Sequence, residues 1–136
     1  MRKLIASACF IVTLAAAALA QDPTKVDPNH YKVEFENAQV RVLRVKVGAG
    51  EKSIMHQHPN AVAIFMTDVN GKFTFPDGKT QDITSKAGEA RWTPAITHQP
   101  ENLGTEPFEV ILVELKQKSM AKRTAKKAQH AIGIRR

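Results

Sequence analysis

Between residues 31 and 115, hydrophobic and polar side chains alternate with a period of two. Tyr31, Val33 and Phe35 alternate with charged residues, and a second alternating run extends from Val40 to Val47. Because successive side chains of a strand point to opposite faces of a sheet, this pattern predicts half-buried β-strands. Further short apolar or alternating runs follow at residues 53–58, 62–66, 73–75, around 83, 90–93 and 108–115. About eight or nine short strands are therefore expected.

Turn-forming residues separate these runs at short intervals. Residues 48–50 and 76–78 are rich in glycine or proline, and Asn70-Gly71 is typical of a tight hairpin turn between the runs at 62–66 and 73–75. No apolar spacing of three and four residues persists over three helical turns, so helix should be a minor component. The pattern indicates an all-β single domain, a sandwich or barrel of antiparallel strands whose open end could admit a small ligand.

The first twenty residues have the pattern of a secretory signal peptide. Two basic residues precede an apolar stretch over residues 4–19, which ends in an Ala-Leu-Ala cleavage pattern ahead of Gln21. We expect cleavage before Gln21, a periplasmic or secreted mature chain, and no stable membrane anchor. An uncleaved anchor helix is the alternative, because the stretch approaches the length that spans a bilayer. The single cysteine, Cys9, lies in this segment, so the mature domain would have no thiolate metal ligand.

Charge divides the rest of the chain into a domain and a tail. The formal net charge is +7, yet between residues 21 and 115 ten basic residues face thirteen acidic ones, whereas residues 116–136 hold eight basic residues and no acidic one. We interpret residues 21–30 as a linker, 31–116 as the domain and 117–136 as a basic, disordered tail. No nucleic-acid partner is expected after export, although a basic tail could also bind nucleic acid or anionic lipid.

Three of the five histidines are candidates for a metal site. His56 and His58 stand two apart on a predicted strand, so their side chains point to one face and can share an ion. His98, which follows Pro94 near the next strand, is the candidate third ligand. An isolated pair of this kind is also common on a solvated strand face, so the interpretation depends on the residues around the histidines.

The residues around these histidines follow two spacings. The first is Gly50-Glu-Lys-Ser-Ile-Met-His56-Gln-His58, and the second is Gly88-Glu-Ala-Arg-Trp-Thr-Pro94-Ala-Ile-Thr-His98-Gln-Pro-Glu-Asn102. In this order they resemble the two short motifs of the cupin superfamily, in particular small single-domain bacterial cupins. The resemblance covers roughly residues 31–116. It implies a small antiparallel cupin β-barrel of the jelly-roll type, in which His56, His58 and His98 bind a divalent metal ion.

Two departures from the cupin pattern bear on the metal and on a loop. The glutamate expected soon after the second histidine is replaced by Val62, or by Ala63 if the longer spacing applies, and the glycine of the second motif is replaced by Ile96. Without a carboxylate ligand the ion keeps its full charge, which favours an anionic substrate and leaves coordination positions open. The ion could be iron, zinc, manganese, nickel or copper, because imidazole does not distinguish them.

Arg91 and Trp92 are neighbours on one predicted strand and must face opposite sides of the sheet. If Arg91 faces the cavity, its guanidinium would help to bind a substrate carboxylate beside the metal. If Trp92 faces inward, it belongs to the core or forms an aromatic wall, and packing in the core is the expected place for a single large aromatic residue.

The remaining polar candidates are given structural roles. Asn102 is expected to hold the turn that follows the second motif rather than to contact a substrate. His30 and His130 lie outside the apolar strands and are expected to be solvated. Met55 and Gln57, which flank the first motif histidine, should face away from the ligands.

Two functions remain open from the sequence alone. One is a metal-dependent enzyme of the oxygenase, isomerase or hydrolase type that acts on a small anionic substrate, and the other is a non-catalytic module that binds a small ligand or a metal. No catalytic residue stands out, because the chain has no recognisable nucleophile triad, phosphate loop or carboxylate pair. The expected partner is a small-molecule ligand or substrate, and a homodimer is left open.

Overall fold

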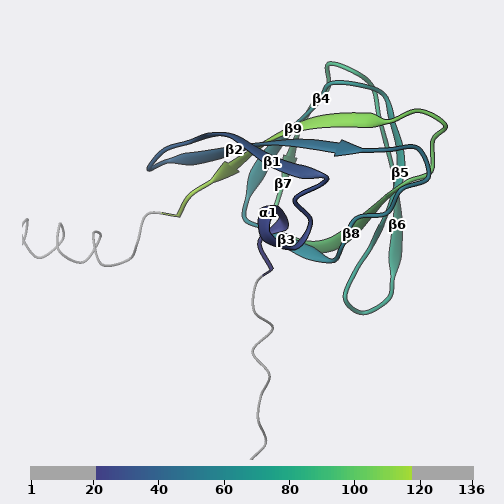
Figure 1. Cartoon of the computed structure of the whole chain (residues 1–136), viewed down its shortest axis with the longest axis horizontal. Coiled ribbons are helices and arrows are strands. Elements are labelled where there is room, and N and C mark those ends of the chain that lie inside the picture. The colour runs from purple at the N-terminus through teal and green to yellow at the C-terminus, as the bar shows by residue number, and fades with distance from the viewer. Residues whose placement is uncertain (1–20, 118–136) are drawn as a thin grey trace, which may run out of the picture.

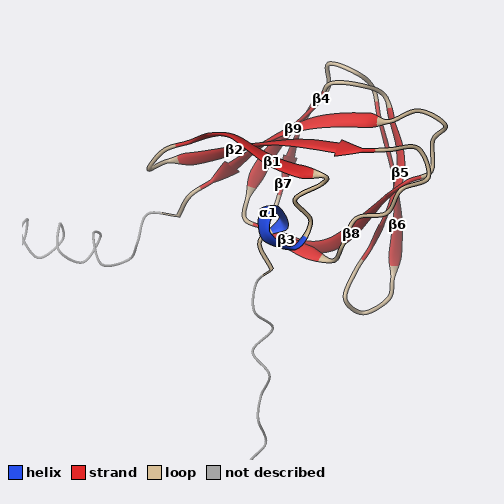
Figure 2. Ribbon diagram, viewed as in Figure 1, coloured by secondary structure: helices blue, strands red, loops and turns tan. Residues whose placement is uncertain are grey.

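Nine strands and one short helix make up residues 21–117, the part of the chain that the computed structural model describes (Figure 2). The elements are α1 (Pro23–Val26), β1 (Tyr31–Glu36), β2 (Val40–Val47), β3 (His56–His58), β4 (Ala61–Phe65), β5 (Val69–Thr74), β6 (Thr80–Ser85), β7 (Ala90–Thr93), β8 (Ile96–Asn102) and β9 (Phe108–Leu115). The all-β prediction is confirmed. The predicted signal peptide and nearly all of the predicted tail lie outside the described residues. Within residues 21–117, no helix is long and apolar enough to cross a membrane.

The strands form two antiparallel sheets that enclose the core. The five-stranded sheet has the order β1-β2-β9-β4-β7, and the four-stranded sheet has the order β3-β8-β5-β6. Figure 1 shows the sheets curving around a common interior, with the end of the β1–β2 hairpin extending beyond the barrel. The core is made of apolar residues, chiefly from the larger sheet: Tyr31, Leu43, Val45, Val47, Ala61, Ala63, Phe65, Val69, Phe108, Val110 and Leu112.

Strand register in the five-stranded sheet decides which way Arg91 and Trp92 face. Arg91 pairs with Ala63, which pairs with Leu112, and both of these partners are buried. Arg91 therefore continues an inward-facing row. Trp92 lies in the next row and leaves 57% of its surface exposed, so the expectation that it packs in the core is wrong. Because neighbours on a strand alternate, the inward place at this position belongs to Arg91.

Asn70 and Gly71 lie inside β5, so the predicted tight hairpin turn at these residues is wrong. A β-carbon at position 71 would lie 2.8 Å from the carbonyl oxygen of Glu101 on the neighbouring strand β8, closer than real side chains come. The glycine therefore permits a close approach between two strands instead of forming a turn. The turn between β5 and β6 lies at residues 75–79, where Gly78 has a φ of 81°.

Residues 21–30 pack against the barrel and do not form a free linker. Asp22 caps the first turn of α1, and both Pro23 and Asp27 are buried. The backbone N–H of Gln57 on β3 donates to the carbonyl oxygen of Gln21 at 2.9 Å. A proline at the start of α1 and a capping carboxylate before it favour a compact turn over an extended linker.

His30 is not solvated as predicted. Its Nδ1 lies 2.8 Å from a carboxylate oxygen of Asp27, and its Nε2 lies 3.1 Å from Glu51. Only 16% of its side chain is exposed. Burial lowers the pKa of His30, but the hydrogen bonds to the two carboxylates outweigh this and raise it above the ordinary histidine value. His130 lies outside the described residues.

Candidate metal centre

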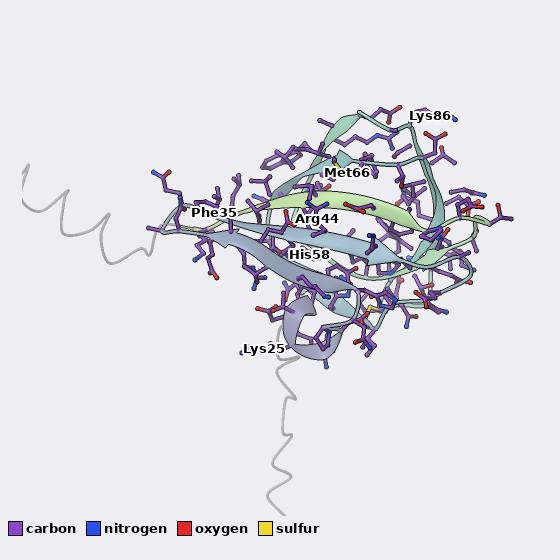
Figure 3. All side chains as sticks on the ribbon, turned by 45° about the horizontal axis from the view of Figure 1, so that its top comes forward. Lys25, Phe35, Arg44, His58, Met66 and Lys86 are labelled. Carbon is purple, nitrogen blue, oxygen red and sulfur yellow. The ribbon has the colours of Figure 1, made fainter. Side chains whose placement is uncertain are left out.

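Strand pairing brings the three predicted metal ligands together. His56 on β3 stands directly opposite His98 on β8, and His58 lies two residues further along β3 on the same face. Each offers a ring nitrogen, and these atoms all lie within 4.8 Å of one another. All three imidazoles are buried, at 1% to 5% exposure. Figure 3 places the labelled His58 in the middle of the molecule, whereas Lys25 and Lys86 lie at its edges.

Hydrogen bonds set the orientation of the two β3 histidines. Nδ1 of His56 donates to the carbonyl oxygen of Ile54 at 2.6 Å, and Nδ1 of His58 donates to Glu114 at 2.6 Å. In a neutral imidazole whose Nδ1 donates, Nε2 carries the lone pair, and the two Nε2 atoms lie 2.9 Å apart. Two lone pairs at this separation repel unless they share a cation, so the arrangement fits a bound metal ion.

His98 gives a second indication of a metal. The ring is packed edge-on against Phe73 at 4.3 Å between centroids and against His56 at 5.0 Å. Among residues 21–117, neither of its ring nitrogens has a hydrogen-bond partner. An unsatisfied buried polar group costs about 1–3 kcal/mol, a cost that coordination to a metal would remove. The three side chains therefore fit the divalent ion that the cupin pattern implies.

Burial keeps two of the candidate ligands neutral. It lowers the pKa of His56 to about 4 and that of His98 to about 2, and in both cases the positive charge of a neighbouring protonated histidine would lower it further. At neutral pH these imidazoles are therefore uncharged, which is the form that coordinates a metal.

These pKa values predict how the stability of the metal-free protein depends on pH. An unfolded histidine titrates near 6.5, so below that pH the unfolded chain binds protons that the folded His56 and His98 reject. The free energy of unfolding should then fall by up to about 1.4 kcal/mol per pH unit for each of the two histidines as pH decreases from 6.5 to 5. Urea unfolding of metal-free protein at pH 7, 6 and 5 measures this slope. A stability that does not change over this interval would contradict the assignment of neutral, buried imidazoles.

Glu114 is a site residue that the sequence analysis missed. It is 1% exposed, and besides His58 it accepts a hydrogen bond from Nε of Arg41 at 2.6 Å. Burial alone would raise the pKa of Glu114, but the hydrogen bonds from His58 and Arg41 lower it below its ordinary value. The carboxylate is thus anionic and orients His58 through its outer nitrogen, an arrangement common around metal-binding histidines.

The sequence does contain a signal for Glu114. In β9, Phe108, Val110, Leu112 and Glu114 occupy the inward positions of one alternating run. A charged residue in the core-facing position of a strand is unusual unless it is paired.

A cavity of about 290 Å³ lies beside the histidines. His58 and His98 line one part of it, and most of the remaining lining is aliphatic or aromatic. Of the two positions where the cupin pattern places a glutamate, Ala63 lines the cavity and Val62 does not. The exposed side chains of Gln81 and Arg91 also line the cavity, which marks their side as its opening. The space is therefore suited to a small, largely apolar molecule.

Arg91 lines the cavity, whereas Asn102 holds a turn. The guanidinium of Arg91 lies 5.4 Å from the centre of the Phe65 ring and donates to Glu89 at 2.5 Å. Asn102 is buried, and its side chain accepts from the N–H of Gly104 at 2.8 Å and donates to the carbonyl oxygen of Glu106 at 2.9 Å. The expected turn-holding role of Asn102 is confirmed, and Arg91 is the cationic side chain that lines the cavity.

The antiparallel double-sheet barrel is the fold of cupin domains among solved structures. A cupin domain from Bordetella pertussis Tohama I has a TM-score of 0.60 and 21% identity, and the match covers 64% of this chain and 92% of that one. An RmlC-like cupin family protein with a double-stranded β-helix fold, from Methanocaldococcus jannaschii, has a TM-score of 0.51 and 15% identity over 62% and 77% of the chains. The chain has the fold of a small cupin domain.

Sequence comparison adds nothing to this assignment. No family model matches the chain, and no curated protein is significantly similar to it. At these levels of identity the structural neighbours establish the fold alone, so the function has to be argued from the site itself.

Proposed function

We propose that the protein binds a divalent metal ion through His56, His58 and His98 and holds a small organic anion beside it in the barrel. The observation behind this proposal is the convergence of three buried imidazoles, two of which already donate through Nδ1 while the third has no partner among residues 21–117. When bound, the ion would supply Lewis-acid or redox chemistry. The protein would orient the ligands and exclude water from their surroundings.

The apolar lining of the cavity and the guanidinium of Arg91 support a small organic anion as the ligand. Apolar walls favour a hydrocarbon or aromatic body, and Arg91 offers its guanidinium to a carboxylate. Glu89 already accepts from Nη2 of Arg91, so an incoming carboxylate would bind the remaining N–H groups of the guanidinium or take the place of Glu89. The pairing is exposed, so exchanging it should cost little.

An enzymatic role, of the oxygenase, isomerase or hydrolase type, is favoured because the cluster found among residues 21–117 offers three ligands and no fourth. Ala63 occupies the cavity-lining position where a glutamate would stand, and three protein ligands leave positions open, as in catalytic metal sites. Among the described residues that line the cavity there is no Asp or Glu, so the chain offers no carboxylate general base there. A reaction in this cavity would depend on the metal.

Export is part of the proposal. The apolar leader over residues 4–19 and the Ala-Leu-Ala pattern before Gln21 support a periplasmic or secreted location. The domain would then acquire its metal and its ligand outside the cytoplasm.

Metal analysis and ligand titration together test the proposed function. We expect about one divalent ion per chain, and we expect benzoate or hexanoate to bind the metal-loaded protein more tightly than the neutral amides of the same shape. Arg91→Gln should weaken carboxylate binding about tenfold, since a charged hydrogen bond is lost, and leave the metal content unchanged. Lys86→Gln, which removes an exposed charge outside the cavity, is the matched control. Equal affinity for acids and amides would refute the anionic ligand class.

A further inference from the structure

Residues 21–27, here called the N-terminal strap, lie against the strand that holds two of the proposed metal ligands. The helix α1 within the strap packs on β1 and β3. The carbonyl oxygen of Gln21 accepts from the N–H of Gln57, the residue between His56 and His58. Lys25 is exposed on the outer side of the strap, where Figure 3 labels it at the edge of the molecule. The strap thus contacts the backbone of β3, the strand that holds two of the three proposed ligands.

A chain of charged side chains connects Asp22 in the strap with His58. The Asp22 carboxylate accepts from Nη1 of Arg41 at 2.6 Å, and Nε of the same guanidinium donates to Glu114 at 2.6 Å. Glu114 in turn accepts from Nδ1 of His58. Arg41 is only 16% exposed, so the ion pairs that hold it are shielded from solvent on most sides.

A second, shorter connection runs from Asp27 to His56. The buried carboxylate of Asp27 accepts from the backbone N–H of Ile54 at 3.1 Å, and the carbonyl oxygen of Ile54 accepts from Nδ1 of His56 at 2.6 Å. Asp27 also pairs with His30. Two different carboxylates of the strap are therefore connected, through one or two intermediate residues, to the outer nitrogens of both β3 histidines.

We propose that the N-terminal strap forms the outer shell of the metal centre, with Asp22 and Asp27 as positioning residues that fix the orientation of His58 and His56. This inference rests on the proposed metal function. It implies that metal binding and docking of the strap stabilise each other, because a coupling free energy between two sites is reciprocal. A strap that only stabilises the fold would not be coupled to metal in this way.

The proposal is tested on the whole purified protein with Zn²⁺ as the probe. Trypsin cleaves after exposed lysines in mobile segments, so cleavage after Lys25, followed by mass spectrometry, reports how often the strap leaves the barrel. We expect Zn²⁺ to slow this cleavage severalfold in the wild type. In Asp22→Asn, Zn²⁺ affinity should fall about 3–10-fold, less than the ~10–100-fold typical when the direct partner of a ligand is lost.

The variants distinguish an effect of Asp22 on the orientation of the metal ligands from an effect on the stability of the fold. Asparagine is a good helix cap, so Asp22→Asn keeps the start of α1 and removes the charge that holds Arg41. Asp77→Asn makes the same Asp-to-Asn change in a more exposed ion pair, with Lys79 in the β5–β6 turn, and should leave Zn²⁺ affinity unchanged. Melting of the metal-free proteins shows whether either change acts through the fold.

The possible results distinguish a failure of the strap proposal from a failure of the proposed metal function. Unchanged Zn²⁺ affinity in Asp22→Asn, together with cleavage after Lys25 that is indifferent to Zn²⁺, would overturn the role of the strap and leave the metal centre in place. A wild-type protein that binds no Zn²⁺, Fe²⁺, Mn²⁺, Ni²⁺ or Cu²⁺ would instead overturn the proposed function and the inference that rests on it.

Discussion

Replacing His98 by alanine is expected to lower the affinity for a divalent metal by more than ~100-fold, a larger loss than outer-shell changes cause. The residue supplies the ligand from β8 opposite the His56–His58 pair, so two imidazoles from a single strand would remain. Equilibrium dialysis with elemental analysis measures the loss. The His56→Ala/His98→Ala double variant should retain no stoichiometric metal.

Gln57→Ala is the matched control for these ligand variants. Gln57 lies between two of the ligands on β3, yet its side chain is exposed on the opposite face. Its removal should leave metal content unchanged. His30→Ala would be a poorer control, because His30 pairs with Asp27 in the strap. Stoichiometric metal in the double variant would mean that the ion is bound elsewhere.

Glu114→Gln is expected to have the second-largest effect, on both stability and metal affinity. The carboxylate accepts hydrogen bonds from both His58 and Arg41, whereas the amide of glutamine turns an N–H₂ group toward one of these donors. Removing one partner of a buried pair costs about 3–5 kcal/mol, and loss of an outer-shell carboxylate lowers metal affinity about 10–100-fold. Urea unfolding of the metal-free variant and metal titration measure the two effects separately.

Glu109→Gln on the same strand provides the comparison. Glu109 pairs with Arg44 and Lys46 on the outer face of β9, away from the cavity. We expect a stability change of about 0–1 kcal/mol and unchanged metal affinity, since exposed ion pairs contribute little. If Glu114→Gln bound metal as tightly as Glu109→Gln, orientation of His58 by Glu114 would not contribute to the centre.

The alternating pattern predicted most of the barrel because local sequence determines which face of a strand is buried. The strands around Tyr31, Val40–Val47 and 108–115 follow from period two alone, and the turn at residues 76–78 follows from its own residues. The turn predicted at Asn70-Gly71 is wrong because the sequence does not distinguish a glycine needed for close approach of two strands from a glycine needed for a turn. Only the neighbouring strand distinguishes the two cases.

The three histidines of the cluster could be predicted from the sequence, but the residues that orient their rings could not. His56 and His58 share a face by spacing, and the cupin motifs point to His98. The partners that orient these rings come from distant positions: Glu114 from β9, Arg41 from β2 and Asp22 from the strap. Such contacts depend on register between strands and on the docking of residues 21–30, whose two prolines and low apolar content suggest a linker.

The central claim, a metal held by three histidines, is tested most directly by anomalous diffraction from crystals of the Zn²⁺-loaded protein. We predict one strong anomalous peak about 2.0–2.1 Å from a ring nitrogen of each of His56, His58 and His98. Glu114 should remain on the far side of His58, hydrogen-bonded to its Nδ1. A Zn²⁺ peak elsewhere on the chain, or one bound by fewer than these three imidazoles, would contradict the account.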